Sequence, residues 1–224
     1  MVTKPGKLSL DYCNGIRKKY FKPLSLFLLL VIIYLLFPFF EGLNMELKYY
    51  PKQNFYGAYA YKKVESKLQA TGWSMGELSE KFHIKAEKTS KFLLIIIVPL
   101  AALVFYAMTF YKRRYLFDHI VFSAEINSFY LLWGFLLLPL LISIIFFITR
   151  LLSINANVYL SDNRIGLLIY IPVVIYTANA AKRFYNFKWR QNMIFCIVFF
   201  AAHTFIVYTL YKFLLFVTVI NQIH

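Results

Sequence analysis

Residues 92–111 read FLLIIIVPLAALVFYAMTFY, twenty residues without a single charged side chain. A helix of ~20 apolar residues crosses the roughly 30 Å hydrocarbon core of a bilayer. Because unpaired backbone groups are costly in lipid, we expect this stretch to be a helix whose hydrogen bonds are all internal. The stretch therefore indicates a membrane protein.

The composition of the whole chain agrees with this class. Of its 224 residues, 60% are hydrophobic and 16% are charged, whereas soluble domains have about 45–50% apolar and about 25% charged residues. An ordinary soluble enzyme, a disordered tail and a secreted disulfide scaffold are thereby excluded. We predict an all-α, polytopic helical membrane bundle of about five transmembrane helices, at residues 23–40, 92–111, 127–149, 164–181 and 192–218.

The predicted spans divide the chain into a basic N-terminal segment, residues 1–22, and a single transmembrane domain, residues 23–224. Residues 41–91 form the longest loop between spans. Its aromatic part, residues 49–61, suits the membrane surface. Residues 62–91 read as helical, with a restart after Gly72 where Ser74 and Glu77 form a capping box, and this helix could continue into the second span.

Charge predicts the orientation of the bundle. The net charge is +15, and the basic residues flank the apolar runs, which favours contact with anionic lipid head groups over nucleic acid. Dense Lys/Arg clusters in residues 1–22, 112–119 and 182–191 belong on the inner face under the positive-inside rule. We therefore expect a cytoplasmic N-terminus, an extracytoplasmic 41–91 loop and an extracytoplasmic C-terminus. We interpret the first apolar run as a retained span and not as a cleaved signal peptide.

Polar residues gather where the third span begins. Ionisable groups inside a membrane are functional candidates by default. In a helix, Asp118 and Glu125 are two turns apart on one face, and a second polar line runs beside them. The set can be a proton or cation relay, or an amphipathic helix lying at the interface, and both interpretations stay open. This polar face consists of Asp118, His119, Ser123, Glu125 and Asn127.

Three motifs that mix tyrosine with basic residues lie at the expected inner face. They begin at Asp11, Tyr115 and Tyr176. Simple anchorage at the interface explains them, and so does a specific surface that binds head groups or a partner. Their candidate residues are Arg17, Tyr20, Arg113, Tyr115, Arg183 and Tyr185.

In their order and spacing, these motifs resemble a bacterial domain-of-unknown-function family of multi-span inner-membrane proteins. The resemblance implies a helical fold and an inner-membrane location, and no established activity. Members often begin with a Cys-x-x-Cys zinc ribbon, which we expect to be absent here because Cys13 has no neighbouring cysteine and the first span follows closely. Glu125 and Asn127 stand where such members carry histidines, so we expect no metal site.

No catalytic motif is present. The sequence has no glycine-rich phosphate loop, no His-Glu-x-x-His, no Gly-x-Ser-x-Gly and no Cys-x-x-Cys, so we expect no enzyme, no cofactor and no catalytic residue. We expect a non-enzymatic subunit or scaffold of an envelope membrane complex, bound to another membrane or envelope protein or to itself as a homo-oligomer. The alternative is a small oligomeric transporter or channel that uses the polar face of the third span.

Overall fold

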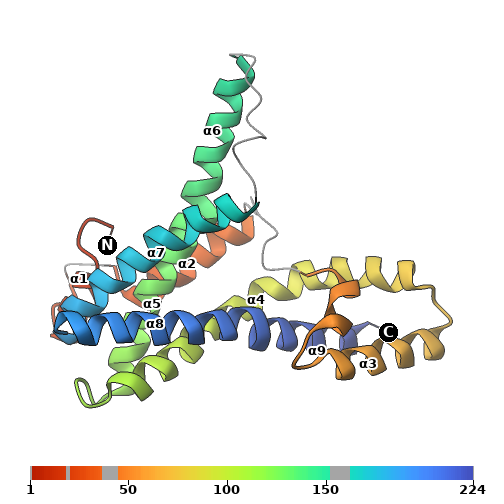
Figure 1. Ribbon diagram of the computed structural model, residues 1–224, viewed down its shortest axis with the longest axis horizontal. Coiled ribbons are helices and arrows are strands. Elements are labelled where there is room, and N and C mark those ends of the chain that lie inside the picture. The colour runs from red at the N-terminus through yellow and green to blue at the C-terminus, as the bar shows by residue number, and fades with distance from the viewer. Residues whose placement is uncertain (1, 19–20, 37–44, 152–161, 224) are drawn as a thin grey trace. The chain divides into compact units, whose positions relative to one another are not determined.

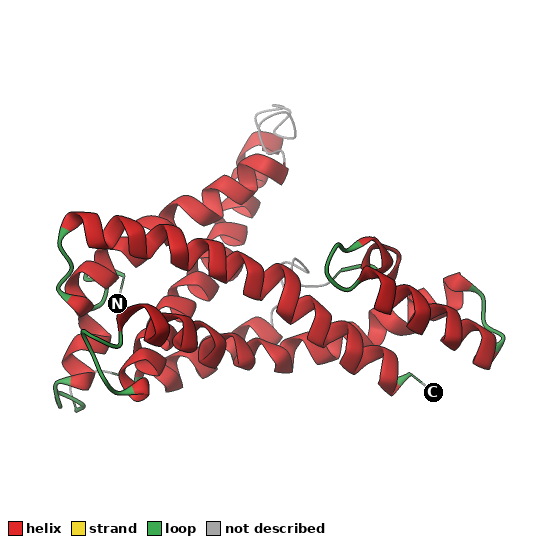
Figure 2. Cartoon of the chain, turned by 60° about the horizontal axis from the view of Figure 1, so that its bottom comes forward, coloured by secondary structure: helices red, strands yellow, loops and turns green. Residues whose placement is uncertain are grey.

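A computed structural model describes residues 2–18, 21–36, 45–151 and 162–223, and these residues form helices and no strands (Figures 1 and 2). The predicted all-helical fold is confirmed. The α-helices are α1 (Lys7–Cys13), α2 (Pro23–Leu36), α3 (Gly57–Thr71), α4 (Met75–Thr109), α5 (Leu116–Leu131), α6 (Leu138–Leu151), α7 (Asp162–Tyr185), α8 (Trp189–Phe205) and α9 (Lys212–Gln222). A 3-10 helix, η1 (Leu47–Lys52), and two π-helical segments, η2 (Leu132–Leu137) and η4 (Ile206–Tyr211), complete the described elements.

Three helices among the described residues are long and apolar enough to cross a membrane. They are Phe92–Thr109, Leu116–Leu151 and Trp189–Gln222, and they contain the predicted spans 92–111, 127–149 and 192–218 almost entirely. The first predicted span corresponds to a shorter apolar helix, Pro23–Tyr34, and its predicted end, residues 37–40, lies outside the described residues. The membrane class is thus supported, and the predicted count of about five spans is not confirmed by the three found among the described residues.

The third predicted span begins earlier than its apolar residues suggest. Helix α5 starts at Leu116 and runs without a break through η2 into α6. The π-helical turn lies just before Pro139, whose missing N–H disturbs the regular hydrogen-bond ladder. At this turn Trp133 Nε1 donates to Leu168 O over 2.9 Å, and a Cβ on Gly134 would lie 3.3 Å from Ile169. Helix α7 therefore packs closely on the π-helical turn.

The helices form two compact units. Unit 1 consists of Met1–Phe40 and Val98–Ala202, and unit 2 of Glu41–Ile97 and His203–His224. Aromatic rings and alanines fill the core of unit 1. Phe129 stacks on Tyr176 with ring centroids 3.8 Å apart, and Phe105 stacks on Phe199 at 4.6 Å. This core joins the C-terminal part of α4 with α5, α7 and α8.

Unit 2 joins η1 and α3 to α9 and to the N-terminal part of α4. Tyr50, which is fully buried, lies 5.0 Å from the Phe216 ring and 5.4 Å from the Phe82 ring. Helix α3 begins at Gly57 and not at the predicted residue 62, because the chain before it turns tightly: a Cβ on Gly57 would lie 2.5 Å from Pro51 O.

The predicted restart after Gly72 is confirmed. Gly72, with φ +70°, ends α3 in the left-handed conformation that favours glycine. Ser74 then donates through N and Oγ to Glu77 Oε2 over 2.8 and 2.9 Å, and Glu77 N donates back to Ser74 Oγ over 3.3 Å. These bonds form the capping box, and they lower the pKa of Glu77. Helix α4 continues from this cap into the second span, as predicted.

Candidate functional site

The carboxylate of Glu125 is a polar group of unit 1 with several hydrogen-bond partners. Glu125 lies on α5 and is fully buried. Its Oε1 accepts hydrogen bonds from Gly6 N and from the Tyr176 hydroxyl, over 2.8 and 2.9 Å. Its Oε2 accepts from Ser9 N and Ser9 Oγ, over 2.8 and 2.5 Å. Four donors from two other segments thus satisfy one buried carboxylate.

This carboxylate caps a helix that has no cap of its own. Gly6 is the residue before α1 and has no side chain, and the first turn of α1 contains no acidic residue. The free N–H groups at a helix N-terminus need acceptors, and a negative charge there is favourable. Glu125 supplies both from α5, more than a hundred residues later in the chain.

The segment before α1 lies directly against the end of α7. Gly6 has φ +74°, and a Cβ on it would lie 2.5 Å from the carbonyl oxygen of Ala180. The side chain of Arg183 donates a hydrogen bond to Pro5 O. Position 6 therefore needs glycine both for its backbone conformation and for the close approach of the N-terminal segment to the end of α7.

His119, at the start of α5, joins three segments. Its side chain is fully buried, and its Nδ1 lies 2.9 Å from the Tyr185 hydroxyl. Its Nε2 lies 3.0 Å from Arg113 O, a carbonyl that can only accept. A proton therefore belongs on Nε2, and in the neutral imidazole Nδ1 accepts from the Tyr185 hydroxyl. The structure thus places His119 in a complete hydrogen-bond network.

Ser123 and Asn127 bond to nearby helix groups. Ser123 Oγ donates to Val98 O over 2.8 Å. Asn127 Nδ2 donates to Ser123 O over 2.9 Å and to Ser123 Oγ over 3.2 Å. Both side chains are buried, and both bond to groups of their own unit.

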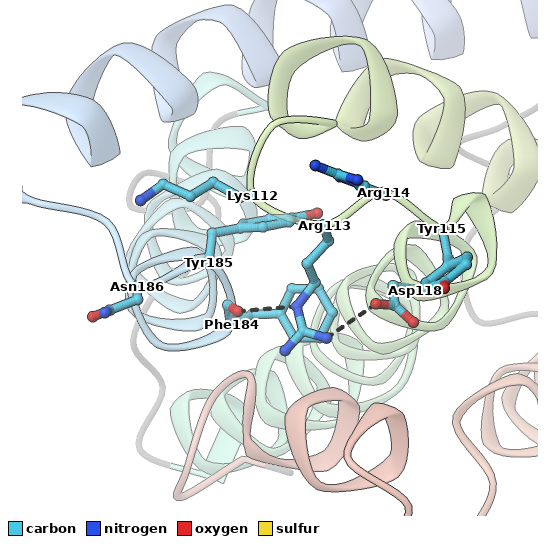
Figure 3. A pocket seen from close by; sticks show the side chains of 8 residues that line it. All are labelled: Lys112, Arg113, Arg114, Tyr115, Asp118, Phe184, Tyr185 and Asn186. Carbon is cyan, nitrogen blue, oxygen red and sulfur yellow. Dashed lines mark hydrogen bonds and ion pairs between the residues drawn. The ribbon is translucent and has the colours of Figure 1, made fainter.

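A basic pocket opens at the turn between α4 and α5, next to the end of α7 (Figure 3). Arg113 spans its floor: Nη1 donates to Asp118 Oδ2 over 3.0 Å, Nε donates to Phe184 O over 3.4 Å, and the guanidinium lies 4.2 Å from the Phe184 ring centroid. The pocket has a volume of about 550 Å³. The residues that line this basic pocket are Lys112, Arg113, Arg114, Tyr115, Asp118, Phe184, Tyr185 and Asn186.

The structure brings some of the predicted basic and aromatic residues together. Arg113, Tyr115 and Tyr185 line the basic pocket. Arg183 holds the N-terminal segment instead. Arg17 lies 5.5 Å from the ring of its neighbour Tyr12, which in turn contacts Phe117 at the start of α5, whereas Tyr20 lies outside the described residues. The three motifs therefore meet in unit 1, and Arg17 reaches the cluster only through Tyr12.

Several partners of the polar face were absent from the sequence-based candidates. Gly6, Ser9 and Tyr176 complete the Glu125 site. Tyr176 was identified only as the first residue of a motif, and the local signal for the other two was Pro5-Gly6, a dipeptide typical of a turn, followed by a serine three residues later. Among the described residues, no group of three or more His, Cys, Asp and Glu side chains lies together as a metal site would require.

Cys13 gives an independent test of how α1 is packed. Burial, and next the neighbouring Asp118, raise the pKa of its thiol from 9.0 to about 12. Only the thiolate reacts with alkylating reagents, so at pH 8 the reactive fraction is about 1000-fold smaller than for an unperturbed thiol. We expect alkylation of Cys13 by iodoacetamide, followed by intact mass in a Cys196→Ala background, to be slower in the folded protein by two orders of magnitude or more. Equal rates in folded and SDS-unfolded protein would contradict this packing.

Comparison with known proteins finds a similarity in one part of the chain. Residues 1–35 match the family described as "Protein of unknown function (DUF3667)". No curated protein and no solved structure matches the chain. The matched residues contain α1 and most of α2, so they include the segment that Glu125 and Arg183 hold in place.

Proposed function

We propose that this chain is a non-enzymatic integral protein of the bacterial inner membrane that serves as a subunit or scaffold of an envelope complex. Its N-terminus is cytoplasmic and its C-terminus extracytoplasmic. Its partner is another membrane or envelope protein, or a second copy of the same chain. Three apolar helices that could cross a membrane support the membrane location.

The observation that carries this proposal is that residues of the polar face have hydrogen-bond or ion-pair partners within the protein. Asp118 pairs with Arg113, Glu125 accepts four hydrogen bonds, and His119 lies between Tyr185 and Arg113 O. A transport path or a catalytic centre needs polar groups that can exchange partners with an ion, with water or with a substrate. Here these groups bind α1, α5 and α7 to one another, which favours a structural role.

Helix α6 offers a surface for a partner. Residues 143–148 cover more than one helical turn, and all six are exposed. Within unit 1, α6 continues the helix from η2 and then extends away from the other helices (Figure 1). Apolar helices associate in membranes through close side-chain packing. The exposed surface of α6 therefore suits contact with a neighbouring membrane helix.

The basic residues support the proposed orientation. The clusters at 112–114 and 182–183 lie at the same end of unit 1, since Lys112 lines a pocket with Tyr185 and Asn186. Such dense clusters in short loops favour the cytoplasmic side.

Photo-crosslinking in native membranes tests the proposed complex. Replacement of Phe147, which is 65% exposed on α6, by p-benzoylphenylalanine should give a protein adduct of one discrete mass, whose partner residue crosslinks back to α6. The matched control is Phe135, which belongs to the same continuous helix and is 7% exposed, and it should give no adduct. Absence of a protein adduct from position 147 and from every other exposed position of α6 would overturn the proposal.

A flux measurement tests the transport alternative. Purified protein in proteoliposomes should conduct protons, Na⁺ and K⁺ no faster than liposomes without protein. Asn127→Ala is the informative variant, because its side-chain amide donates only to Ser123 and its loss should leave the fold intact. A wild-type flux that Asn127→Ala abolishes would replace the scaffold proposal by a transport function.

A further inference from the structure

We propose that the basic pocket holds the phosphate of an anionic phospholipid, with the lipid's glycerol and first methylenes in the apolar cavity beside it. The proposal rests on the membrane location given above, and it requires no protein partner. It is carried by the charge of the pocket, by the partners of its side chains and by an apolar cavity lined by residues next to the pocket residues in the chain.

The pocket carries an unbalanced positive charge. Three cations and one carboxylate line it, which leaves two positive charges in excess. Arg113 and Asp118 neutralise each other over 3.0 Å. Lys112 and Arg114 are exposed, and Figure 3 shows neither of them joined to the Arg113–Asp118 pair. Two cations at the mouth of a pocket therefore remain available for an anion.

The floor of the pocket fixes its shape. Phe184 and Tyr185 are buried, and Arg113 lies flat on the Phe184 ring while it donates to Phe184 O. This bond also occupies a free carbonyl at the C-terminal end of α7, which would otherwise repel an anion. The exposed side chains of Lys112, Arg114 and Tyr115 line the pocket beside this floor (Figure 3).

An apolar cavity lies next to the basic pocket along both chain segments that form it. Its lining includes Tyr111 and Phe187, the direct neighbours of the pocket residues Lys112 and Asn186. Met108, Ile194 and Phe195 also line it, together with Thr109 and Gln191, and its volume is about 140 Å³. A soluble phosphate compound would leave this cavity unused, whereas a phospholipid has an apolar part directly beside its phosphate. The juxtaposition therefore favours a lipid.

The variants that test this site leave the floor intact. In Lys112→Gln/Arg114→Gln, two exposed side chains lose their charge, while Arg113 keeps its bonds to Asp118 and Phe184. The control, Lys62→Gln/Lys63→Gln, removes the same charge from two exposed neighbours on α3. Comparing the lipid affinities of the two variants distinguishes binding at the pocket from a general effect of net charge.

Native mass spectrometry of detergent-solubilised protein, titrated with dioleoylphosphatidylglycerol, measures the binding. Each basic residue near an anionic head group strengthens binding about fivefold, so the pocket variant should bind about 30-fold more weakly than wild type, and the control should match wild type. Wild type should bind dioleoylphosphatidylcholine and sn-glycerol 3-phosphate more weakly than the anionic lipid.

Three results would overturn the proposal. If the wild type and the pocket variant bind the anionic lipid equally tightly, the site is excluded. If the control variant loses as much affinity as the pocket variant, the effect is one of net charge. Binding of sn-glycerol 3-phosphate as tight as that of the anionic lipid assigns the pocket to soluble phosphates. Because purified protein is used, the result is independent of whether α6 crosslinks to a partner.

Discussion

Replacement of Glu125 by alanine is expected to lower the free energy of unfolding by about 3–5 kcal/mol, because several buried hydrogen-bond donors lose their acceptor at a cost of roughly 1–3 kcal/mol each. Truncation leaves Gly6 N, Ser9 N and the Tyr176 hydroxyl without their acceptor, in a site from which water is excluded. Each buried donor that loses its partner adds its own desolvation cost. We therefore expect α1 to leave its place on α5 before the rest of unit 1 unfolds.

Thermal unfolding in mild detergent and limited proteolysis of the N-terminal segment measure this effect. The matched control is Glu65→Ala, which removes an exposed glutamate on α3 and should change stability by less than about 0.5 kcal/mol. An alanine variant at position 125 that unfolds like wild type and keeps residues 5–13 protected from protease would show that the carboxylate does not hold α1.

Replacement of Gly6 by alanine is expected to cost about 2–4 kcal/mol. The left-handed backbone conformation costs a residue with a Cβ roughly 1–2 kcal/mol of conformational free energy. In addition, a Cβ only 2.5 Å from Ala180 O would force the two backbone segments apart. The separation would also lengthen the bond from Arg183 to Pro5 O. Hydrogen exchange of the α1 amides should therefore increase more than exchange in α5.

Gly72→Ala separates the conformational cost from the cost of the close approach to Ala180. Gly72 has φ +70°, close to the +74° of Gly6, but nothing lies within 4 Å of the Cβ that it would gain. It should therefore show only the conformational cost, and the difference between the two variants measures the close approach to Ala180. Equal effects of the two substitutions would be inconsistent with the packing of residue 6 on α7.

Local features of the sequence predicted the helices well. The apolar runs gave the positions of the three long helices, and Ser74 with Glu77 gave the start of α4, because hydropathy and capping depend on residues close together in the chain. The predicted third span begins at residue 127, whereas α5 already begins at Leu116. Polar side chains extend a buried helix when distant groups satisfy them, and the sequence does not reveal those groups.

The candidate site shows the same limit. The tyrosine and arginine motifs were recognised as a set, but the acceptor role of Glu125 could not be inferred. Two of its donors are backbone N–H groups of Gly6 and Ser9, 119 and 116 residues away. Since every residue except proline carries such a donor, no residue type marks it in advance. Only the tertiary structure distinguishes a carboxylate that caps a helix from one that faces a transport path.

The Glu125 cap also sets an order of events during synthesis. Ser9 precedes Glu125 by 116 residues, so at about 5–20 residues per second its acceptor is made roughly 6–23 seconds later. Until then α1 lacks a cap, and a seven-residue helix is too short to be stable alone. The residues of α1 are synthesised before α5 and α7, and we therefore expect α1 to reach its final position only after those two helices have formed.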